Sequence, residues 1–331
     1  MIGAGSQGVV YLAERMEPRQ RVALKVLQLP DERRRRVVLR YFRREQRHLA
    51  WLNHPGIVKL YDVGETERGD PYFVMEHVEG PTLEDYCRDY GPDTDETLRI
   101  FVQICKAVSH FHHLQVIHRD LKPTNILISS PDGVAVPKIV DFGLSKATHP
   151  GLQSLSDPSS GTVGTWFYLS PETVFGKKPG IAADVYSLGA ILHEMLVGLP
   201  PFHELVTASE SEMYEALRNR TPPTPSSILS QRAALHESSR DQEESKRRIT
   251  RMRNGLDAIL LQALAKNPEH RFASAADMAM AVEKQMEPTT RIPRPPERMP
   301  QVSGAKTSLS IRWAWGLLAA AVAVAAAILC L

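Results

Sequence analysis

The sequence predicts an α+β fold in which a small antiparallel sheet precedes a larger, mainly helical part. Up to about residue 80, short β-type runs such as VVYLA, VALKVL, IVKLYDVG and YFVMEHV surround one helical segment. From residue 82 to about residue 286, the apolar positions recur mostly with the helical period, as in TLRIFVQICKAVSHFHHL. One short hairpin interrupts the helices, because NILISS and VPKIV are joined by the turn residues Pro131, Asp132 and Gly133.

The composition is that of a globular chain with little net charge. Its 331 residues are 43% apolar and 24% charged, and a net charge of +2 gives no reason to expect nucleic acid as a partner. The three cysteines, Cys87, Cys105 and Cys330, are far apart and lack the paired spacing of a zinc site or a disulfide framework. We therefore expect the main body of the chain in a reducing, cytoplasmic setting.

The last stretch, residues 313–331, reads WAWGLLAAAVAVAAAILCL and carries no charge. At a rise of about 1.5 Å per residue, a helix of this length is about long enough to cross a bilayer of roughly 30 Å. Two interpretations compete, a single-pass membrane anchor and a buried hydrophobic helix. Tryptophans at the start of the stretch and basic residues before it favour the anchor, with the preceding domain on the cytoplasmic side. Residues 287–312, rich in Pro and Arg, would then be a juxtamembrane linker.

Two charged stretches carry no assigned chemistry. Residues 221–255 contain prolines and then a mixture of charges, which is typical of a solvated insertion or a loose helix. The basic run at residues 33–36 fits a solvated helix face, and a phosphate-docking or anionic-lipid role is the alternative.

The glycine-rich start of the chain indicates a phosphate-binding turn. Gly3, Gly5 and Gly8 follow the pattern G-x-G-x-x-G, which a dinucleotide-binding fold also uses. That fold requires a helix directly after the glycines, whereas here the β-type run VVYLA follows. No Gly-Lys-Ser/Thr closes the pattern, so a Walker loop is excluded. The arrangement predicts a strand, a glycine turn and a second strand.

Lys25 lies in the middle of the apolar run VALKVL, where a lone ammonium group is costly to bury. The next helical segment offers a partner, because Glu45 falls within the apolar stripe formed by Val38, Phe42, Leu49 and Leu52. We expect Lys25 to pair with Glu45. The alternative is a glutamate at the edge of the stripe that reaches water.

Two further motifs carry the strongest signal, HRDLKPTNIL at residues 118–127 and KIVDFGLSK at residues 138–146. With them, the chain resembles the protein kinase family over about residues 2–286, and specifically the bacterial eukaryotic-like Ser/Thr protein kinases. The resemblance implies a two-lobed kinase fold, with an antiparallel-sheet N-lobe over about residues 1–80 and a helical C-lobe over about residues 81–286. The first strand would be a stub, since only Met1 and Ile2 precede Gly3.

The resemblance also implies the catalytic roles of phosphoryl transfer from ATP. Asp120 would orient and deprotonate the substrate hydroxyl, and Lys122 would steady the γ-phosphate. Lys25 would hold the α- and β-phosphates, and Glu45 would fix Lys25. Asn125 and Asp141 match the ligands of Mg²⁺, with Mn²⁺ as the other ion that fits. The expected contacts of ATP are Ile2, Gly3, Gly5, Gly8, Val10, Ala23, Lys25, the gatekeeper Met75, Glu76 and Val78.

Five further residues match structural positions of the family. His118 and Phe142 would set loop geometry, and Asp184 in DVYSLG would brace the catalytic loop. Glu172 in SPE would pair with Arg271 in NPEHRF. We expect all five to be satisfied structural groups that take no part in the chemistry.

The substrate class follows from the same resemblance. Lys122, two residues after Asp120, and GTWFYLSPE with Thr165 are similar to Ser/Thr kinases, so the partners are protein substrates with Ser or Thr acceptors. Arg119 would pair with a phosphate on the activation segment, where Thr162 is the first choice for autophosphorylation. A second copy of the chain would be the partner for phosphorylation in trans.

Two other functions compete with an active kinase. A pseudokinase acting as a nucleotide-binding scaffold is disfavoured because Lys25, Glu45, Asp120, Asn125 and Asp141 are all present. A small-molecule phosphotransferase of related fold is disfavoured by the SPE motif and by the activation segment, which are features of kinases that dock proteins.

Overall fold

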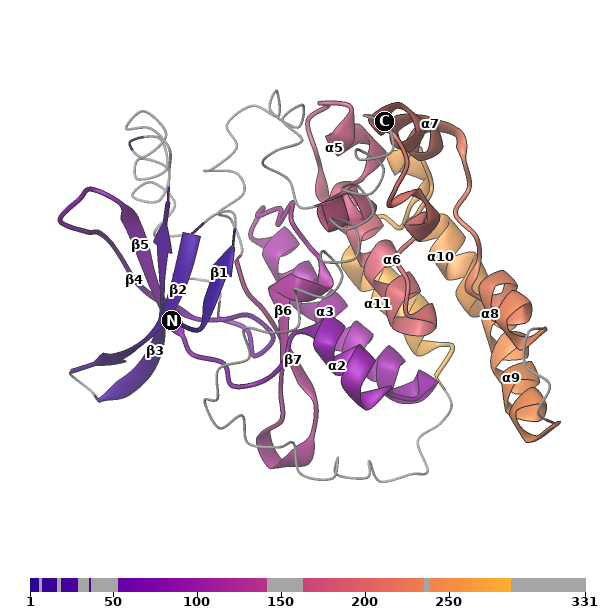
Figure 1. The fold of residues 1–331 in the computed structure, drawn as a ribbon, viewed down its shortest axis with the longest axis horizontal. Helices are drawn as coiled ribbons and strands as arrows, with labels where there is room; N and C mark the ends of the chain where they lie inside the picture. Colours follow the sequence, from indigo (N-terminus) through magenta and orange to yellow (C-terminus); the bar gives the residue numbers. More distant parts are fainter. Residues whose placement is uncertain are drawn as a thin grey trace, which may run out of the picture. The chain divides into compact units, whose positions relative to one another are not determined.

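The computed structural model of the chain describes residues 1–5, 8–16, 19–28, 36, 53–141, 163–234 and 239–286, which belong to one compact unit, Met1–Pro293. Its larger sheet has five antiparallel strands in the order β1-β2-β3-β5-β4 (Figure 1). The strands are β1 (Gly3–Gly5), β2 (Gly8–Arg15), β3 (Gln20–Leu27), β4 (Leu60–Glu65) and β5 (Pro71–Glu76). The predicted small antiparallel sheet is thus confirmed, while most of the helical segment expected before residue 53 lies outside the described residues.

The glycine turn joins β1 to β2, as the strand-turn-strand prediction requires. Gly3 pairs with Val10 and Gly5 with Gly8, and β1 has three residues. Gly8 has φ +148°, and a Cβ added there would lie 2.1 Å from the backbone oxygen of Val26 on β3. Only glycine fits this position without moving a strand.

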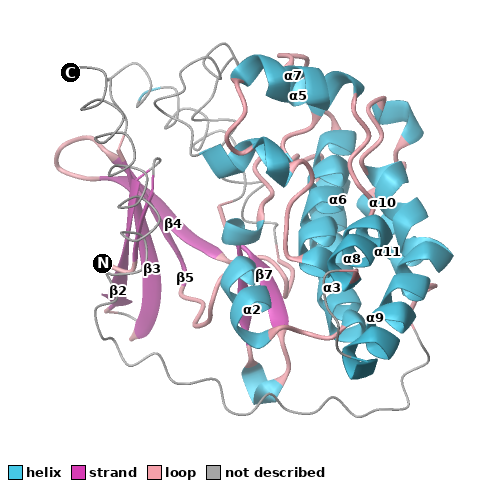
Figure 2. Ribbon diagram, turned by 45° about the vertical axis from the view of Figure 1, so that its right-hand side comes forward, coloured by secondary structure: helices cyan, strands magenta, loops and turns pink. Residues whose placement is uncertain are grey.

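The remaining described part of the unit is mainly helical, as expected (Figure 2). Its helices are α2 (Leu83–Tyr90), α3 (Thr94–His113), α5 (Pro171–Val174), α6 (Ile181–Val197), α7 (Glu210–Asn219), α8 (Pro225–Ala233), α9 (Ser239–Arg251), α10 (Asp257–Ala263) and α11 (Ala275–Glu283). α3 begins at Asp93, whose side chain accepts a hydrogen bond from the Glu96 amide. α6 ends at Gly198, which has φ +74°. Most residues of α6 are buried, so it is an internal helix.

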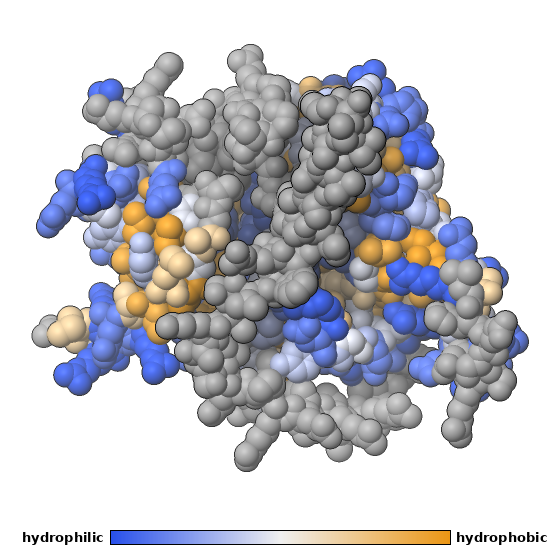
Figure 3. Space-filling model, in the orientation of Figure 1, coloured by the Kyte–Doolittle hydropathy of each residue, from blue (hydrophilic) through white to orange (hydrophobic). Residues whose placement is uncertain are grey.

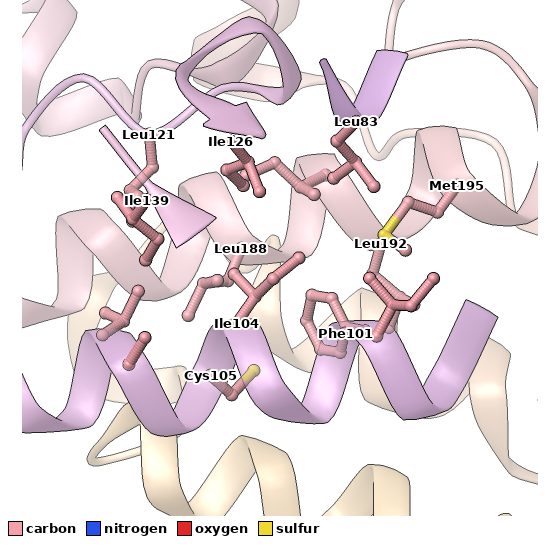
Figure 4. Packing of buried hydrophobic residues seen from close by; sticks show 14 of the residues in the cluster. Leu83, Phe101, Ile104, Cys105, Leu121, Ile126, Ile139, Leu188, Leu192 and Met195 are labelled. Carbon is pink, nitrogen blue, oxygen red and sulfur yellow. The ribbon is translucent and has the colours of Figure 1, made fainter. Parts of the chain in front are cut away.

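The core lies between α3, α6 and a two-stranded sheet, β6 (Ile126–Ser129) with β7 (Val136–Ile139). Figure 4 shows Ile104 of α3 and Leu188 of α6 pointing into this core, together with Ile126 and Ile139 of the hairpin. Leu121, within the HRDLKPTN motif, is 1% exposed and belongs to the same cluster. The motif is therefore anchored on the packed interior of the helical part.

Backbone hydrogen bonds join the hairpin to the chain that enters the larger sheet. Ile57 forms a parallel bridge with Ile139, the Val58 amide donates to the Ile139 carbonyl at 3.0 Å, and the Ile139 amide donates to the Gly56 carbonyl at 2.9 Å. β7 therefore contacts both the helical core and the segment that leads into β4.

The described residues of 221–255, expected as a solvated insertion or loose helix, are largely helical, and α9 is mostly exposed, but the stretch is also fixed to the rest of the unit. They form α8, α9 and the turn after α9, and Ile228, Ile249 and Met252 are buried. Arg232 and Arg248 donate hydrogen bonds of 2.6 Å to the carbonyls of Val197 and Leu196 at the end of α6. Their charges cap the C-terminus of a buried helix, which a count of charged residues does not reveal.

The surface drawn in Figure 3 mixes polar and apolar side chains, with apolar areas over the strands and among the helices. Among the described residues, no helix is long and apolar enough to span a membrane. The stretch 313–331, expected as an anchor, and the linker 287–312 lie outside the described residues.

Candidate active site

Lys25 and Asp141 form the ion pair at the centre of the candidate site. Lys25 Nζ lies 2.8 Å from Asp141 Oδ2, and the lysine side chain is 6% exposed. β3 places Lys25 between Val10 on β2 and Phe73 on β5, so its ammonium group reaches Asp141 from within the sheet. The buried lysine thus has the carboxylate partner that its burial requires.

Glu45 and Phe142 lie outside the described residues. The predicted pairing of Lys25 with Glu45 therefore stays a prediction, and the observed partner of Lys25 is Asp141.

The residues of HRDLKPTN converge on Asp120. Lys122 Nζ lies 3.2 Å from Asp120 Oδ1, and Asn125 Nδ2 donates to Asp120 Oδ2 at 3.0 Å and to the Asp120 carbonyl at 2.8 Å. The Asp120 side chain is 17% exposed, so these partners hold it in a partly desolvated place. This arrangement suits a carboxylate that accepts a proton from an oriented hydroxyl group.

Asp184 of α6 holds the backbone of the same loop through hydrogen bonds. Its Oδ2 accepts the His118 amide and its Oδ1 the Arg119 amide, both at 2.9 Å, and Oδ2 also contacts His112 Nε2 at 2.9 Å. Asp184 is fully buried. The predicted bracing contact is present, and the structure adds His112 as a partner that the sequence motif does not reveal.

The backbone at the site is strained at two positions. Arg119 has φ +69° and Asp141 has φ +63°, a conformation that non-glycine residues seldom adopt. Hydrogen bonds hold both places: the Arg119 amide is held by Asp184, and the Val140 amide donates to the Asn125 carbonyl at 2.9 Å. Such strain persists only where surrounding contacts determine the geometry, and it is concentrated at functional sites.

The predicted metal ligands Asn125 and Asp141 lie on two neighbouring segments of the chain. The hydrogen bond from the Val140 amide to the Asn125 carbonyl joins these segments. The side-chain nitrogen of Asn125 donates to Asp120, which leaves the side-chain oxygen Oδ1 of Asn125 as an acceptor. Asp141 adds carboxylate oxygens. Hard oxygen donors of this kind suit Mg²⁺, which commonly uses one or two protein ligands beside phosphate oxygens. The described residues contain no cluster of three or more His, Cys, Asp or Glu that could hold a metal alone. Asn125 and Asp141 therefore fit a magnesium ion shared with phosphates.

Four of the residues expected to frame adenine belong to the main apolar cluster or pack against it. Ala23 and Met75 are neighbours across β3 and β5 and are 7% and 8% exposed, and Val10 and Val78 pack against the same cluster. Ile2 is half exposed and donates its amide to the Val10 carbonyl at 2.9 Å. Apolar side chains so placed suit the flat face of a base.

The expected pair of Glu172 and Arg271 is present and bidentate. Arg271 Nη1 and Nη2 donate to the two Glu172 oxygens at 2.7 and 2.8 Å, and Arg271 also donates to the carbonyls of Ala182 and Ala265, both at 2.8 Å. Burial alone would raise the pKa of Glu172, but the guanidinium group overrides it and holds this pKa below its ordinary value. The pair is a structural bond between segments far apart in sequence.

A further carboxylate, that of Glu194, contacts the chain that precedes SPE. Tyr168 donates a short hydrogen bond to Glu194 of α6, and the Ser187 hydroxyl donates to the Tyr168 carbonyl at 2.7 Å. Burial raises the pKa of Glu194 to about 7, the Tyr168 hydroxyl opposes this shift, and the nearby Glu84 adds to it. Sequence reasoning missed this group, because a glutamate in a helix carries no motif.

Of the three predicted regulatory residues, Arg119 is fully described, Thr165 is partly described and Thr162 is not described. Thr162 lies outside the described residues, and for Thr165 the structure gives the backbone, in a 3-10 turn from Val163 to Tyr168. Arg119 is placed beside the catalytic loop, and its Nε is buried without a hydrogen-bond partner among the described residues. A guanidinium group in this state suits an anionic partner.

Comparison with known proteins agrees with this geometry. The family model described as "Protein kinase domain" matches residues 1–284, so the chain belongs to the protein kinase family. "Serine/threonine-protein kinase PknB" of Mycobacterium tuberculosis is 38% identical over 283 residues, which are 84% of this chain and 41% of that protein. "Serine/threonine-protein kinase PrkC" of Bacillus subtilis is 37% identical over 280 residues, which are 84% of this chain and 38% of that protein.

A solved structure supports the fold. The crystal structure of the Mycobacterium tuberculosis PknI kinase domain superposes with a TM-score of 0.59 at 26% identity, covering 86% of this chain and 94% of that one. The predicted N-lobe sheet and helical C-lobe of a kinase are therefore confirmed. The chain spans only about two fifths of the length of the two curated relatives, 41% and 38%.

Proposed function

We propose that this chain is a serine/threonine protein kinase that transfers the γ-phosphate of ATP to Ser or Thr hydroxyls of proteins. The observation that carries the proposal is the constellation of Lys25, Asp120, Lys122, Asn125 and Asp141, which the fold brings together with the contacts given above. Relatives named as serine/threonine-protein kinases, at 37% and 38% identity, support the substrate class.

In this function each side chain has a defined task. Asp120, held by Asn125 and Lys122, accepts the hydroxyl proton of the substrate, and Lys122 then faces the charge of the transferred group. Lys25 would bind phosphate oxygens, and Asn125 and Asp141 would hold the magnesium ion. When bound, Mg²⁺ neutralises phosphate charge and orients the phosphates.

Regulation by autophosphorylation is part of the proposal. Arg119 would bind a phosphate on the activation segment, with Thr162 as the preferred acceptor and a second copy of the chain as the enzyme. The buried Nε of Arg119 described above supports an anionic partner. Phosphosite mapping after incubation with Mg-ATP tests this: activity that rises while Thr162 stays unmodified contradicts it.

We further propose a single-pass anchor at residues 313–331, a linker at 287–312 and a cytoplasmic kinase domain at residues 1–286. The support is the uncharged run with its tryptophans and preceding basic residues. Deleting residues 313–331 should move the protein from the membrane pellet to the soluble fraction. Unchanged fractionation would argue for the buried helix.

The decisive experiment measures transfer of ³²P from [γ-³²P]ATP to a generic basic protein and to the chain itself. We expect incorporation with the wild type and its loss in Asp141→Asn and Lys25→Met. Lys284→Met is the matched control, because Lys284 is exposed at the end of α11, away from the site. Nucleotide binding without transfer by the wild type would favour the pseudokinase scaffold, and equal transfer by all variants would refute the site.

A further inference from the structure

Glu76 is expected to lie beside adenine, yet its carboxylate points elsewhere. Its Oε1 lies 2.7 Å from Lys138 Nζ on β7, and its Oε2 accepts the Lys59 amide at 3.2 Å. The two side chains of the pair are 23% and 18% exposed. Both carboxylate oxygens of Glu76 are therefore engaged by partners within the protein.

The pair joins two parts of the proposed ATP site. Glu76 follows the gatekeeper Met75 at the end of β5, where the adenine-framing segment begins. Lys138 lies on β7, three residues before Asp141. The ion pair therefore connects the segment that would hold the base with the strand that carries a metal ligand.

Backbone bonds beside the pair make this connection stiff. The Glu76 amide donates to the Lys59 carbonyl at 2.8 Å. Close by, the Val58 amide donates to the Ile139 carbonyl and the Ile139 amide donates to the Gly56 carbonyl, next to Lys138. Val140, which follows β7, is itself bonded to Asn125, so a shift of β7 would displace Asp141 relative to the base segment and would disturb the link to the catalytic loop.

We propose that Glu76 and Lys138 are positioning residues that couple adenine binding to metal binding, by fixing β7 and hence Asp141 against the segment after Met75. The inference rests on the proposed function and deepens it. The coupling is measured as the ratio by which Mg²⁺ strengthens the binding of ADP. Of the two ligands compared, ADP and adenosine, only ADP engages both the base segment and the metal ligands. Adenosine, which lacks phosphates, reports on the base segment only.

The test determines the dissociation constants of adenosine, ADP and Mg-ADP by calorimetry on the full chain. In Lys138→Met and Glu76→Gln we expect the magnesium enhancement of ADP binding to fall at least about fivefold, the scale of a coupling between sites. Adenosine affinity should stay within about twofold of the wild type. Lys138→Arg, which keeps the charge, and the exchanged pair Glu76→Lys with Lys138→Glu should recover most of the enhancement.

The chain offers a matched control in the exposed pair of Arg21 with Glu79, 3.2 Å apart and 71% and 72% exposed. It also links β3 to the segment after β5, so Glu79→Gln removes an ion pair at the same place without touching β7. We expect Glu79→Gln to keep the wild-type ratio.

Two outcomes overturn the inference. In the first, Lys138→Met and Glu76→Gln both keep the wild-type magnesium enhancement of ADP binding. In the second, the variants lose affinity for adenosine and for Mg-ADP equally. Either result would mean that the pair is only a general structural bond. If Lys138→Met fails to fold, the ratio and the adenosine affinity measured for Glu76→Gln decide between these outcomes. A wild type that binds no nucleotide refutes the proposed function as well, whereas magnesium-dependent binding with unaffected variants refutes this inference alone.

Discussion

Arg271 and Glu172, 99 residues apart, form two parallel hydrogen bonds of 2.7 and 2.8 Å in the interior of the helical part. The Arg271 guanidinium also lies 5.1 Å above the Tyr186 ring, and its side chain has no exposed surface. Because both charges are buried, removing either leaves the other without compensation.

We therefore predict that Arg271→Met and Glu172→Gln each lower the free energy of unfolding by about 3–5 kcal/mol. Urea unfolding followed by circular dichroism measures this loss. Glu243→Gln is the control, since its pair with Arg247 is exposed, at 81% and 65%, and contributes little. A loss below about 1 kcal/mol in both buried variants would contradict the assignment.

Asp184 should affect turnover more than nucleotide binding. Asp184→Asn replaces one acceptor oxygen with an amide group that cannot accept the His118 or Arg119 amide. The loop bearing Asp120 then shifts, and we expect kcat to fall about 100-fold, the cost of a small misplacement of reacting groups. The KM for ATP should change little, since Lys25 and the adenine-framing residues do not contact Asp184. A rise in KM with unchanged kcat would disprove the bracing role.

Gly8 should tolerate no side chain. Gly8→Ala combines φ +148° with a Cβ placed 2.1 Å from the Val26 oxygen, so β2 must move away from β3. We expect a loss of stability of about 1–3 kcal/mol and weaker ATP binding. Gly3→Ala is the comparison for stability, because its added Cβ would meet nothing nearer than 3.9 Å. Equal melting temperatures for the two variants would contradict this reading.

Glu194 gives a pH dependence. Burial raises its pKa to about 7, so the folded state holds a proton that the unfolded state has released between the ordinary carboxyl pKa and about 7. The folded state therefore loses stability relative to the unfolded state as pH rises through this interval, and the loss levels off above it.

Glu194→Gln removes this titration while keeping an acceptor for the Tyr168 hydroxyl. The variant should gain stability over the wild type on going from about pH 5 to pH 8, by up to about 2–3 kcal/mol. Chemical denaturation at several pH values measures the difference. A difference that stays constant over this range, or that has the opposite sign, would show that Glu194 is ionised throughout.

The motif residues could be predicted from the sequence because their identities are fixed by chemistry at short spacing. Asp120, Lys122 and Asn125 lie within six residues, so one loop suffices to bring them together. Lys25 was recognisable as a charge in an apolar strand, and the structure gives Asp141 as its partner. The sheet and the hairpin at residues 126–139 followed from β-type runs and turn residues.

Other contacts could not be predicted because they depend on tertiary arrangement. Lys138 meets Glu76 only because residues 56–58 bring β7 beside the end of β5. The contacts of the stretch 221–255 were missed for a similar reason: Ile228, Ile249 and Met252 are buried, and two of its arginines cap α6. The charged composition of such a stretch predicts exposure to solvent, because it does not show that the residues it contacts lie elsewhere in the chain.

The bridge between Ile57 and Ile139 has a consequence for synthesis of the chain on the ribosome. The strands of the larger sheet are all translated by residue 76, but the segment 56–58 that feeds β4 finds its neighbour only when residue 139 has emerged. Until then the Val58 amide and the Gly56 carbonyl lack these hydrogen bonds, so the larger sheet cannot be joined to the hairpin of the helical part before the chain has been synthesised to residue 139.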